Sequence, residues 1–165
     1  MTVPTNFSSD AADVFPAIRS LIPHTDPMVL LDHLLAVDAE SLCAQVTITT
    51  ASRFYTDGAV PAWIGIEYMA QAIAAFAGYE ALQAGQEVKL GFLLGTRRYE
   101  SQCAGFACGS VLHVTIQRVL QHQNGLGAFE CSIVDASTAG ELVKATVTVF
   151  QPEDAQEFLK PNEQG

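Results

Sequence analysis

The chain has 165 residues, 49% of them apolar and 16% charged, a composition that predicts one folded domain and excludes an intrinsically disordered chain. Eighteen acidic residues against eight basic ones give a net charge of −10. Because neutralising phosphates requires clustered Lys and Arg, this balance argues against nucleic acid and anionic membrane surfaces as partners.

The N-terminal residues 1–13 have neither the basic nor the apolar region of a secretory signal. We therefore expect a flexible arm followed by a cytoplasmic domain. The cysteines form no CxxC pair and have no zinc-ligand spacing, so we predict no metal site. We interpret all four as small buried hydrophobic residues in a reducing compartment, namely Cys43, Cys103, Cys108 and Cys131.

The apolar periodicity predicts a short helix, two strands, a long helix and four more strands. The short helix covers residues 14–22 and ends at Pro23. The long helix runs over residues 61–83, with Pro61 in its first turn and Gly85 after its end. The predicted strands are residues 28–38, 41–50, 87–99, 110–121, 126–134 and 142–150.

The long helix decides the fold class. Residues 58–79 contain one charged residue, Glu67, whose cost in a bilayer argues against a membrane span and for a buried core helix. A helix that is apolar nearly all round must be wrapped, so the antiparallel sheet should curl around it. We therefore predict an α+β hotdog fold, with one domain over residues 14–151 and an acidic tail over 152–165.

Glu67 is the first candidate for chemistry. Loss of hydration should raise the pKa of this carboxyl group toward neutrality unless it is paired, and such a group suits proton transfer. The amides of the first helical turn, from Ala62 to Gly65, could polarise a thioester carbonyl, although capping by Asp57 or by water is an alternative. Gly65 would permit close approach of a ligand or of a partner backbone.

Among the four histidines, His24 is singled out because Pro23 and Pro27 fix its turn. No histidine lies between residues 53 and 80, so Glu67 has no basic partner nearby in the sequence. Arg97 and Arg98 form the one Arg-Arg pair. They could bind the phosphate of a carrier protein, or one of them could pair with Glu100.

Two motifs resemble a known family. The segments IPHTDPMVLLD (22–32) and IEYMAQ (66–71) look like those of beta-hydroxyacyl-ACP dehydratases. The longer segments PAWIGIEYMAQAIAA (61–75) and GFLLGTRRY (91–99) more closely resemble the dehydratase-like proteins of aryl polyene biosynthesis clusters. The similarity covers about residues 15–150, and it implies a hotdog protein acting on 3-hydroxyacyl groups carried by acyl carrier protein.

The resemblance also implies roles for individual residues. Glu67 matches the catalytic acid of the family, and Ala62 matches the glycine whose amide binds the thioester carbonyl. The catalytic histidine of the family precedes the helix, but residues 54–61 contain none. His24 could replace it, a related subunit could supply it, or the site could be incomplete with a structural role.

The same resemblance implies a substrate path and partners. The acyl chain would lie beside Ile66, Met69 and Ile73, and Arg97 and Arg98 would contact the carrier protein. No resident cofactor is implied, because the phosphopantetheine arrives with the carrier. The full set of expected substrate-binding residues is Ala62, Trp63, Gly65, Ile66, Met69, Gln71 and Ile73.

Two other functions stay open. Many hotdog proteins are thioesterases, which need one carboxylate and helix amides but no histidine. The chain could also be a subunit that lacks activity alone and pairs with an active dehydratase paralogue. Residues 87–99 are apolar in both strand registers, which predicts a two-fold dimer through this strand, with a copy or a paralogue, and an acyl tunnel near Glu67 between the subunits.

Overall fold

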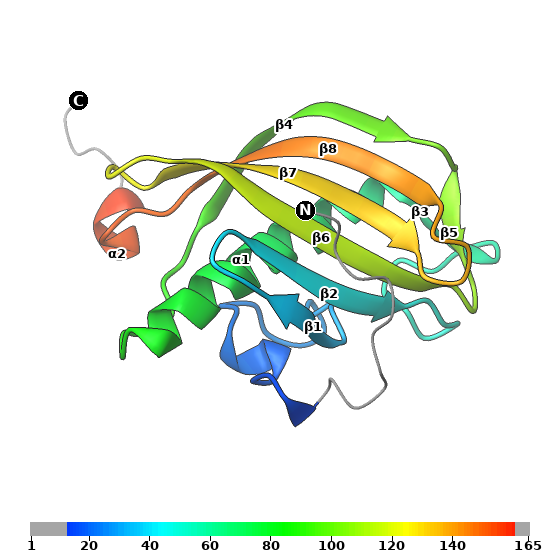
Figure 1. Ribbon diagram of the computed structural model, residues 1–165, viewed down its shortest axis with the longest axis horizontal. Helices are drawn as coiled ribbons and strands as arrows, with labels where there is room; N and C mark the ends of the chain where they lie inside the picture. The colour runs from blue at the N-terminus through cyan, green and yellow to red at the C-terminus, as the bar shows by residue number, and fades with distance from the viewer. Residues whose placement is uncertain (1–12, 161–165) are drawn as a thin grey trace.

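The structure is a computed structural model that describes residues 13–160, and its main element is a six-stranded antiparallel sheet (Figure 1). The strand order is β1-β2-β6-β7-β8-β4, and a separate pair is formed by β3 and β5. The strands are β1 (His33–Val37), β2 (Ser41–Thr47), β3 (Ala59–Pro61), β4 (Phe92–Ser101), β5 (Gly105–Ala107), β6 (Val111–Gln121), β7 (Leu126–Asp135) and β8 (Glu141–Phe150). The helical elements are the 3-10 turns η2 (Ile18–Ser20) and η3 (Ala62–Ile64), and the helices α1 (Gly65–Gln83) and α2 (Ala155–Phe158).

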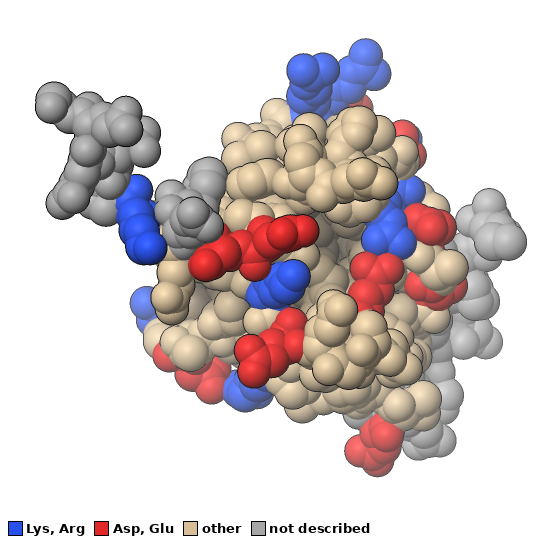
Figure 2. Space-filling view, turned by 90° about the vertical axis from the view of Figure 1, so that its left-hand side faces the viewer, with Lys and Arg blue, Asp and Glu red and all other residues tan. Residues whose placement is uncertain are grey.

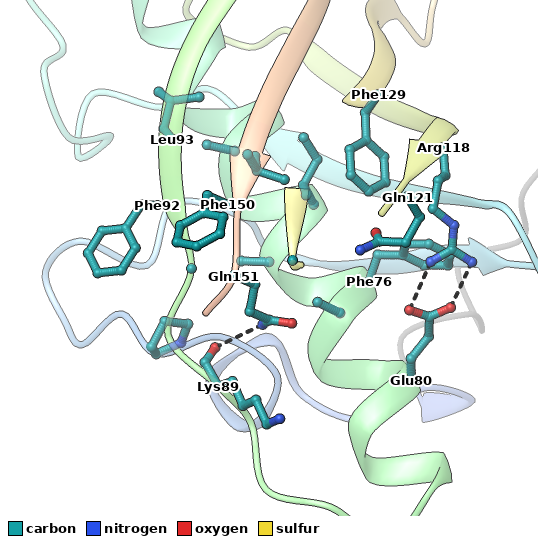
Figure 3. A pocket seen from close by; sticks show the side chains of 18 of the residues that line it. Phe76, Glu80, Lys89, Phe92, Leu93, Arg118, Gln121, Phe129, Phe150 and Gln151 are labelled. Atoms are coloured by element: carbon teal, nitrogen blue, oxygen red, sulfur yellow. Dashed lines mark hydrogen bonds and ion pairs between the residues drawn. The ribbon is translucent and has the colours of Figure 1, made fainter. Parts of the chain in front are cut away.

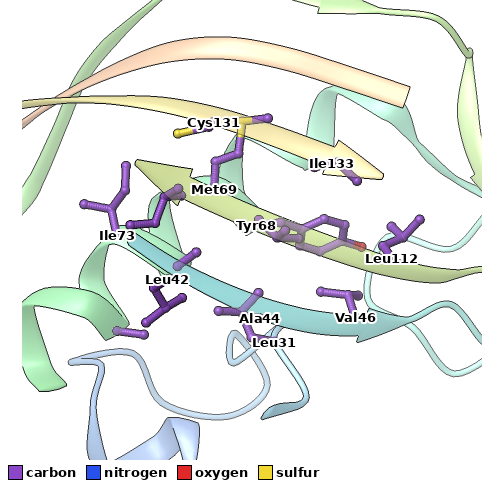
Figure 4. Packing of buried hydrophobic residues seen from close by; sticks show 14 of the residues in the cluster. Leu31, Leu42, Ala44, Val46, Tyr68, Met69, Ile73, Leu112, Cys131 and Ile133 are labelled. Carbon is purple, nitrogen blue, oxygen red and sulfur yellow. The ribbon is translucent and has the colours of Figure 1, made fainter. Parts of the chain in front are cut away.

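Helix α1 lies along the concave face of the sheet, which curves around it (Figure 1). Its side chains Met69, Ala72 and Phe76 are buried, and the ring of Phe76 meets that of Phe129 on β7 edge to face at 6.3 Å. Figure 4 shows the same layer from the sheet side, with apolar residues of β2, β6 and β7 over the helix. This arrangement confirms the predicted α+β hotdog fold, because one face of the sheet covers the helix.

The predicted element boundaries needed correction at several points. The helix expected at residues 14–22 is only the short turn η2, and the strand expected from residue 28 begins at His33. The backbone of residues 28–30 binds a side chain of α1 instead of a neighbouring strand. Pro61 belongs to β3 and α1 begins at Gly65, because η3 makes the first turn. The pair of β3 and β5 was not predicted, since each strand has three residues.

Strand β4 forms one edge of the sheet and pairs with β8 alone. The strand expected from residue 87 begins at Phe92, where the register starts opposite Phe150. Leu93 and Leu94 are exposed in the single chain. An edge strand offers unpaired backbone groups to another chain. The predicted dimer needs such a free edge, and β4 has one in the single chain.

The remaining predictions concern the chain ends and the cysteines. The expected arm, residues 1–13, lies outside the described residues except for its last residue. The tail expected from residue 152 contains the short helix α2. Cys43 and Cys131 are buried as predicted, whereas Cys103 is only partly buried and Cys108 is exposed, so the common interpretation was wrong for these two.

Gly78 marks the closest approach between α1 and the N-terminal segment. A Cβ atom there would clash with the carbonyl oxygen of Leu21 and lie 2.7 Å from its carbonyl carbon. We expect Gly78→Ala to destabilise the protein by about 1–3 kcal/mol, although Ala favours a helix, because a backbone group must move. Thermal unfolding measures the loss. Gly95→Ala on β4, where the added carbon meets nothing within 4 Å, is the control, and an equal effect of both changes would contradict this packing.

Candidate active site

A cavity of about 300 Å³ runs along one side of α1. One stripe of the helix forms its floor, with Glu67 near one end and Glu80 near the other. Their separation of 13 positions along the helix corresponds to a rise of about 20 Å. The opposite wall comes from the start of β4 and the end of β8, including Phe92 and Phe150 (Figure 3). The small side chains on the helix leave the space open, namely Ala70, Ala74 and Ala77.

The turn that carries His24 brings this histidine to Glu67 at one end of the cavity. The Nε2 atom of His24 lies 3.5 Å from Oε1 of Glu67, and both side chains are about 30% exposed. Both residues line the cavity. The structure thus brings together the two candidates that are 43 positions apart in the sequence, and it gives Glu67 a basic partner within its own chain.

Gln71 holds helix α1 and the segment that follows His24 together, and its side chain is fully buried. Its amide nitrogen donates to the carbonyl oxygen of Met28 at 2.6 Å and to Oε1 of Glu67 at 3.0 Å. Its Oε1 accepts the backbone N–H of Leu30 at 2.9 Å. Gln71 lies one helical turn after Glu67, so one side chain both orients the carboxylate and fastens the segment that follows His24. Gln71 does not line the cavity, and the structure assigns it a positioning role in place of the expected substrate contact.

The partners of Glu67 decide the direction of its pKa. The hydrogen bond from His24 lowers the pKa of the carboxyl group, and burial only partly opposes this effect. The bond from Gln71 and the charge of His24 lower the pKa further. The expected rise applied to an unpaired group; Glu67 is paired, so its pKa is lowered instead. The carboxylate is the form that this environment favours at neutral pH.

The end of the cavity near Glu80 is polar. Arg118 on β6 donates to both carboxylate oxygens of Glu80, at 2.9 and 3.1 Å (Figure 3). It also donates to Glu40 at 2.9 Å. Its guanidinium carbon lies 4.9 Å from the centre of the Phe76 ring. On this side of the molecule the surface is hollowed between acidic and basic side chains (Figure 2).

Several expected substrate contacts lie elsewhere. Met69 is fully buried in the core, and Trp63 is 65% exposed. Met69, Trp63 and Ile66 do not line the cavity. The space in front of Gly65 is filled by side chains that include the Tyr99 hydroxyl and Phe106, so no ligand approaches there. Of the three side chains expected along the acyl chain, the structure retains Ile73.

The Ala62 amide is also already engaged. It donates to the carbonyl oxygen of Ala104 at 3.0 Å, while the Ala62 carbonyl accepts the hydroxyl of Tyr99. The amide is therefore not free to bind a thioester carbonyl as expected. This role was expected from the motif alone, and the motif did not show that the Ala104 carbonyl already binds this amide.

The cavity wall contains residues that the sequence analysis missed. Counting along α1 from Glu67 in steps of three or four residues reaches Ala70, Ala74 and Ala77, and this stripe was available as a signal. The contributions of Phe92, Phe150 and Arg118 had no such signal, because three separate strands bring them to the helix.

Arg97 and Arg98 lie on the edge strand β4, exposed and away from the cavity. Arg98 has a positive φ of 56° at an irregularity in the pairing of β4 with β8. Within residues 13–160 neither arginine forms an ion pair, so the alternative pairing with Glu100 is not present. Their expected contact with a carrier protein stays a prediction.

The described residues, 13–160, have neither a metal-binding cluster nor a helix able to span a membrane. No cluster of three or more His, Cys, Asp or Glu side chains in this part of the chain could hold a metal ion. No helix among the same residues has the length and apolar character needed to cross a membrane.

The long helix wrapped by an antiparallel sheet, with a carboxylate at the end of an apolar cavity, defines a protein of the hotdog class. The model of the ApeP-like family, described as ApeP dehydratase, matches residues 16–160. The chain therefore belongs to the ApeP-like dehydratase family, which confirms the resemblance to the dehydratase-like proteins of aryl polyene biosynthesis. A search of curated proteins gave no significant match.

Solved structures agree with this assignment. A chain of the dehydratase heterocomplex ApeI:P from Xenorhabdus doucetiae is 30% identical, with a TM-score of 0.80 over 88% of this chain and 99% of that one. A hypothetical thioesterase with coenzyme A from Streptococcus pneumoniae is 14% identical, with a TM-score of 0.57 over 72% and 84% of the two chains. The PaaI protein of Escherichia coli, from its phenylacetic acid degradation operon, is 13% identical, with a TM-score of 0.54 over 71% and 80%. The last two show the fold alone.

The pairing of His24 with Glu67 predicts a measurable change in a pKa. In His24→Leu we expect the pKa of the Glu67 carboxyl group to rise, because burial then acts with less opposition. In the native protein the contribution of this pair to stability is present at neutral pH and is lost as the pH falls through the lowered pKa. Carbon-13 NMR of the carboxyl group measures the pKa. His122→Leu, at the exposed β6–β7 turn, should leave it unchanged.

The hydrogen bonds of Gln71 predict a loss of stability. Gln71→Met keeps most of the volume but leaves the Leu30 N–H and the Met28 carbonyl without this partner. We expect a loss of about 1–3 kcal/mol in the free energy of unfolding, measured by urea denaturation. Gln83→Met, the same change at the exposed end of α1, is the matched control. Equal stability of Gln71→Met and the native protein would contradict the clamp.

Proposed function

We propose that this protein dehydrates 3-hydroxyacyl thioesters carried by acyl carrier protein, in the cytoplasm, during polyene-type acyl synthesis. The observation that carries the proposal is the Glu67–His24 pair at one end of a largely apolar cavity. The cavity offers a place for an acyl chain, and the pair offers a proton acceptor beside it. Membership of the ApeP-like dehydratase family supports the same reaction.

Glu67 acts as both base and acid in this proposal. Its lowered pKa keeps it ionised, so the carboxylate takes the proton from Cα of the substrate. The electron pair of the C–H bond forms the new C=C bond, and the C–O bond at the 3-position breaks. The carboxylic acid then returns the same proton to the departing hydroxyl, which leaves as water. The carboxylate is restored, and no second base is consumed.

His24 supports the carboxylate in this scheme. Among the described residues its Nδ1 atom is buried and has no hydrogen-bond partner. The other ring nitrogen, Nε2, faces Glu67 and is therefore the one that donates to the carboxylate. This interpretation replaces the expectation that His24 is the missing base, and it removes the need for a histidine in residues 54–61.

The substrate brings its own phosphopantetheine arm, so the proposal includes no resident cofactor. Arg97 and Arg98 remain the proposed contacts for the acidic carrier protein, because both are exposed cations in a chain that has only eight basic residues. An Arg side chain binds phosphate and carboxylate groups well. Removal of both charges should weaken carrier binding more strongly at low ionic strength than at high ionic strength.

The working protein is proposed to be a dimer with a dehydratase paralogue. The related chain from Xenorhabdus doucetiae belongs to a dehydratase heterocomplex. In this chain the edge strand β4 has its backbone open to pairing and two exposed leucines, Leu93 and Leu94. The start of the same strand also forms one wall of the cavity, so pairing at this edge would extend that wall and place the acyl tunnel beside the partner.

The reaction is tested with 3-hydroxyacyl carrier protein, with and without the paralogue. Mass spectrometry separates the two possible products, since dehydration removes water with the thioester intact and a thioesterase releases the free thiol. We expect Glu67→Gln to lower the rate of dehydration by about 10²-fold or more. His24→Gln should lose less, because an amide can also donate to Glu67. His122→Gln is the matched control and should keep full activity.

Three results would count against the proposal. Full activity in Glu67→Gln would remove the role of this carboxylate. A loss in His24→Gln as large as that in Glu67→Gln would show that the imidazole itself transfers the proton. Release of free thiol by the native protein would favour the thioesterase alternative.

A further inference from the structure

Trp63 continues the helical stripe that forms the floor of the cavity. Glu67, Ala70 and Ala74 follow one another at steps of three and four positions. One turn before Glu67 the same spacing reaches Trp63, in the turn η3 that leads directly into α1. Trp63 is 65% exposed, whereas its two neighbours in η3 are buried. An exposed tryptophan ring therefore precedes the carboxylate by a rise of about 6 Å, on the side away from the acyl cavity.

Phe54 provides a second exposed ring beside Trp63, and we call the two rings the Trp63–Phe54 surface. The ring centroids lie 6.5 Å apart at an interplanar angle of 52°, and Phe54 is 41% exposed. The backbone of Phe54 has a φ of 66°, a conformation that bulky residues rarely adopt. Such a conformation persists only where the surrounding structure holds it, and it is concentrated at functional sites. The position of this ring therefore calls for an explanation beyond packing.

The backbone beneath the Trp63–Phe54 surface is fixed. The Ala62 N–H donates to the carbonyl oxygen of Ala104 at 3.0 Å, and the Ala62 carbonyl oxygen accepts the hydroxyl of Tyr99. Tyr99 belongs to β4, so this second bond joins η3 to the edge of the sheet. A surface held in this way can bind a ligand without the entropy cost of ordering a loop.

Positive charge lies next to the two rings, although the chain has a net charge of −10. The guanidinium carbon of Arg53 lies 5.8 Å from the centre of the Phe54 ring. Within residues 13–160 Arg53 forms no ion pair. Arg98 directly precedes Tyr99, the residue that binds the base of η3. Aromatic rings beside cations fit an occupant that is partly apolar and carries a negative charge.

We propose that the Trp63–Phe54 surface binds the phosphopantetheine arm of the acyl carrier protein. This assignment rests on the proposed function, which places the thioester at Glu67 and the acyl chain along Ala70. The arm then leaves the thioester in the opposite direction along the helix, toward Trp63. Its apolar part packs on the two rings, and its phosphate is attracted to Arg53.

Binding is tested through the fluorescence of Trp63, which is the only tryptophan of the chain. The protein is assembled with a paralogue whose own tryptophans are replaced by phenylalanine. We expect a saturable change in emission with acyl-phosphopantetheine amides, which cannot turn over, and with the carrier that bears its arm. The carrier without the arm should cause no change.

Two fluorescence results would overturn the proposal. An equal change with the carrier that lacks the arm would show that the folded part of the carrier covers Trp63. A change caused by the paralogue alone, with no further response to the arm, would show that the partner subunit covers the rings. A response to the arm without any dehydration would support the surface and reject the proposed reaction.

Kinetics measure how much the contact contributes. In Trp63→Leu we expect KM for the acyl carrier substrate to rise about three- to tenfold with kcat nearly unchanged, the range of one aromatic contact. Arg53→Gln should raise the same KM more strongly at low ionic strength than at high ionic strength. Val119→Ala, at an exposed apolar residue of β6 outside the cavity, is the control and should leave KM unchanged.

A truncated substrate separates the arm from the reacting group. The N-acetylcysteamine thioester of the same acyl group lacks the outer part of the arm, so its kcat/KM should fall less in Trp63→Leu than that of the carrier substrate. An equal loss for both substrates, carried by kcat, would overturn the arm contact, because Trp63 would then act on the reacting atoms.

Discussion

The hydrogen bonds of the Gln71 side chain hold together the two segments on which the candidate site depends. The helix carries Glu67 and the N-terminal segment carries His24, and no regular secondary structure joins them. Gln71 is buried and bonds to Met28, Leu30 and Glu67 at the same time. An amide buried in an apolar core is costly unless its donors and acceptor are satisfied, so this side chain fixes both segments in one arrangement.

The helix that carries this carboxylate has two different sides, one facing the core and one facing the cavity. On the core side of α1 buried residues such as Tyr68, Met69 and Ala72 belong to one apolar cluster with residues of β2, β6 and β7. On the cavity side the helix presents alanines, which fill less space and leave a groove beneath the start of β4 and the end of β8. The same helix therefore supplies the core and the site. This explains why its sequence is apolar on nearly all sides although only one side packs against the sheet.

The pairing of Glu67 with His24 determines the kind of chemistry that the site supports. A carboxyl group in an apolar helix without a partner would hold its proton at neutral pH, whereas this one has a lowered pKa because His24 and Gln71 bind its charged form. The site therefore contains a ready proton acceptor. Edge strand β4 connects this site to assembly, because its start forms part of the cavity wall and its free edge can pair with another chain.

The sequence by itself determined the fold class, the central helix, most of the sheet and the importance of Glu67. These features follow from the spacing of apolar residues along the chain and from the single charge in an apolar segment. Any fold of this chain must accommodate both. The sequence also placed the family correctly through the segments around His24 and Glu67. It did not determine which face of the helix meets a cavity, and so it named Met69 and Ile66 where the structure has Ala70 and Ala74.

Only the tertiary structure decided the partners of individual groups. The distance between His24 and Glu67, the engagement of the Ala62 amide by Ala104, and the ion pairs of Arg118 all join residues that are far apart in the chain. Hydrogen bonds and ion pairs depend on distances of about 3 Å, and such distances follow from how the strands and the helix pack. For this reason the direction of the Glu67 pKa could not be read from the sequence, whereas the presence of a buried carboxyl group could.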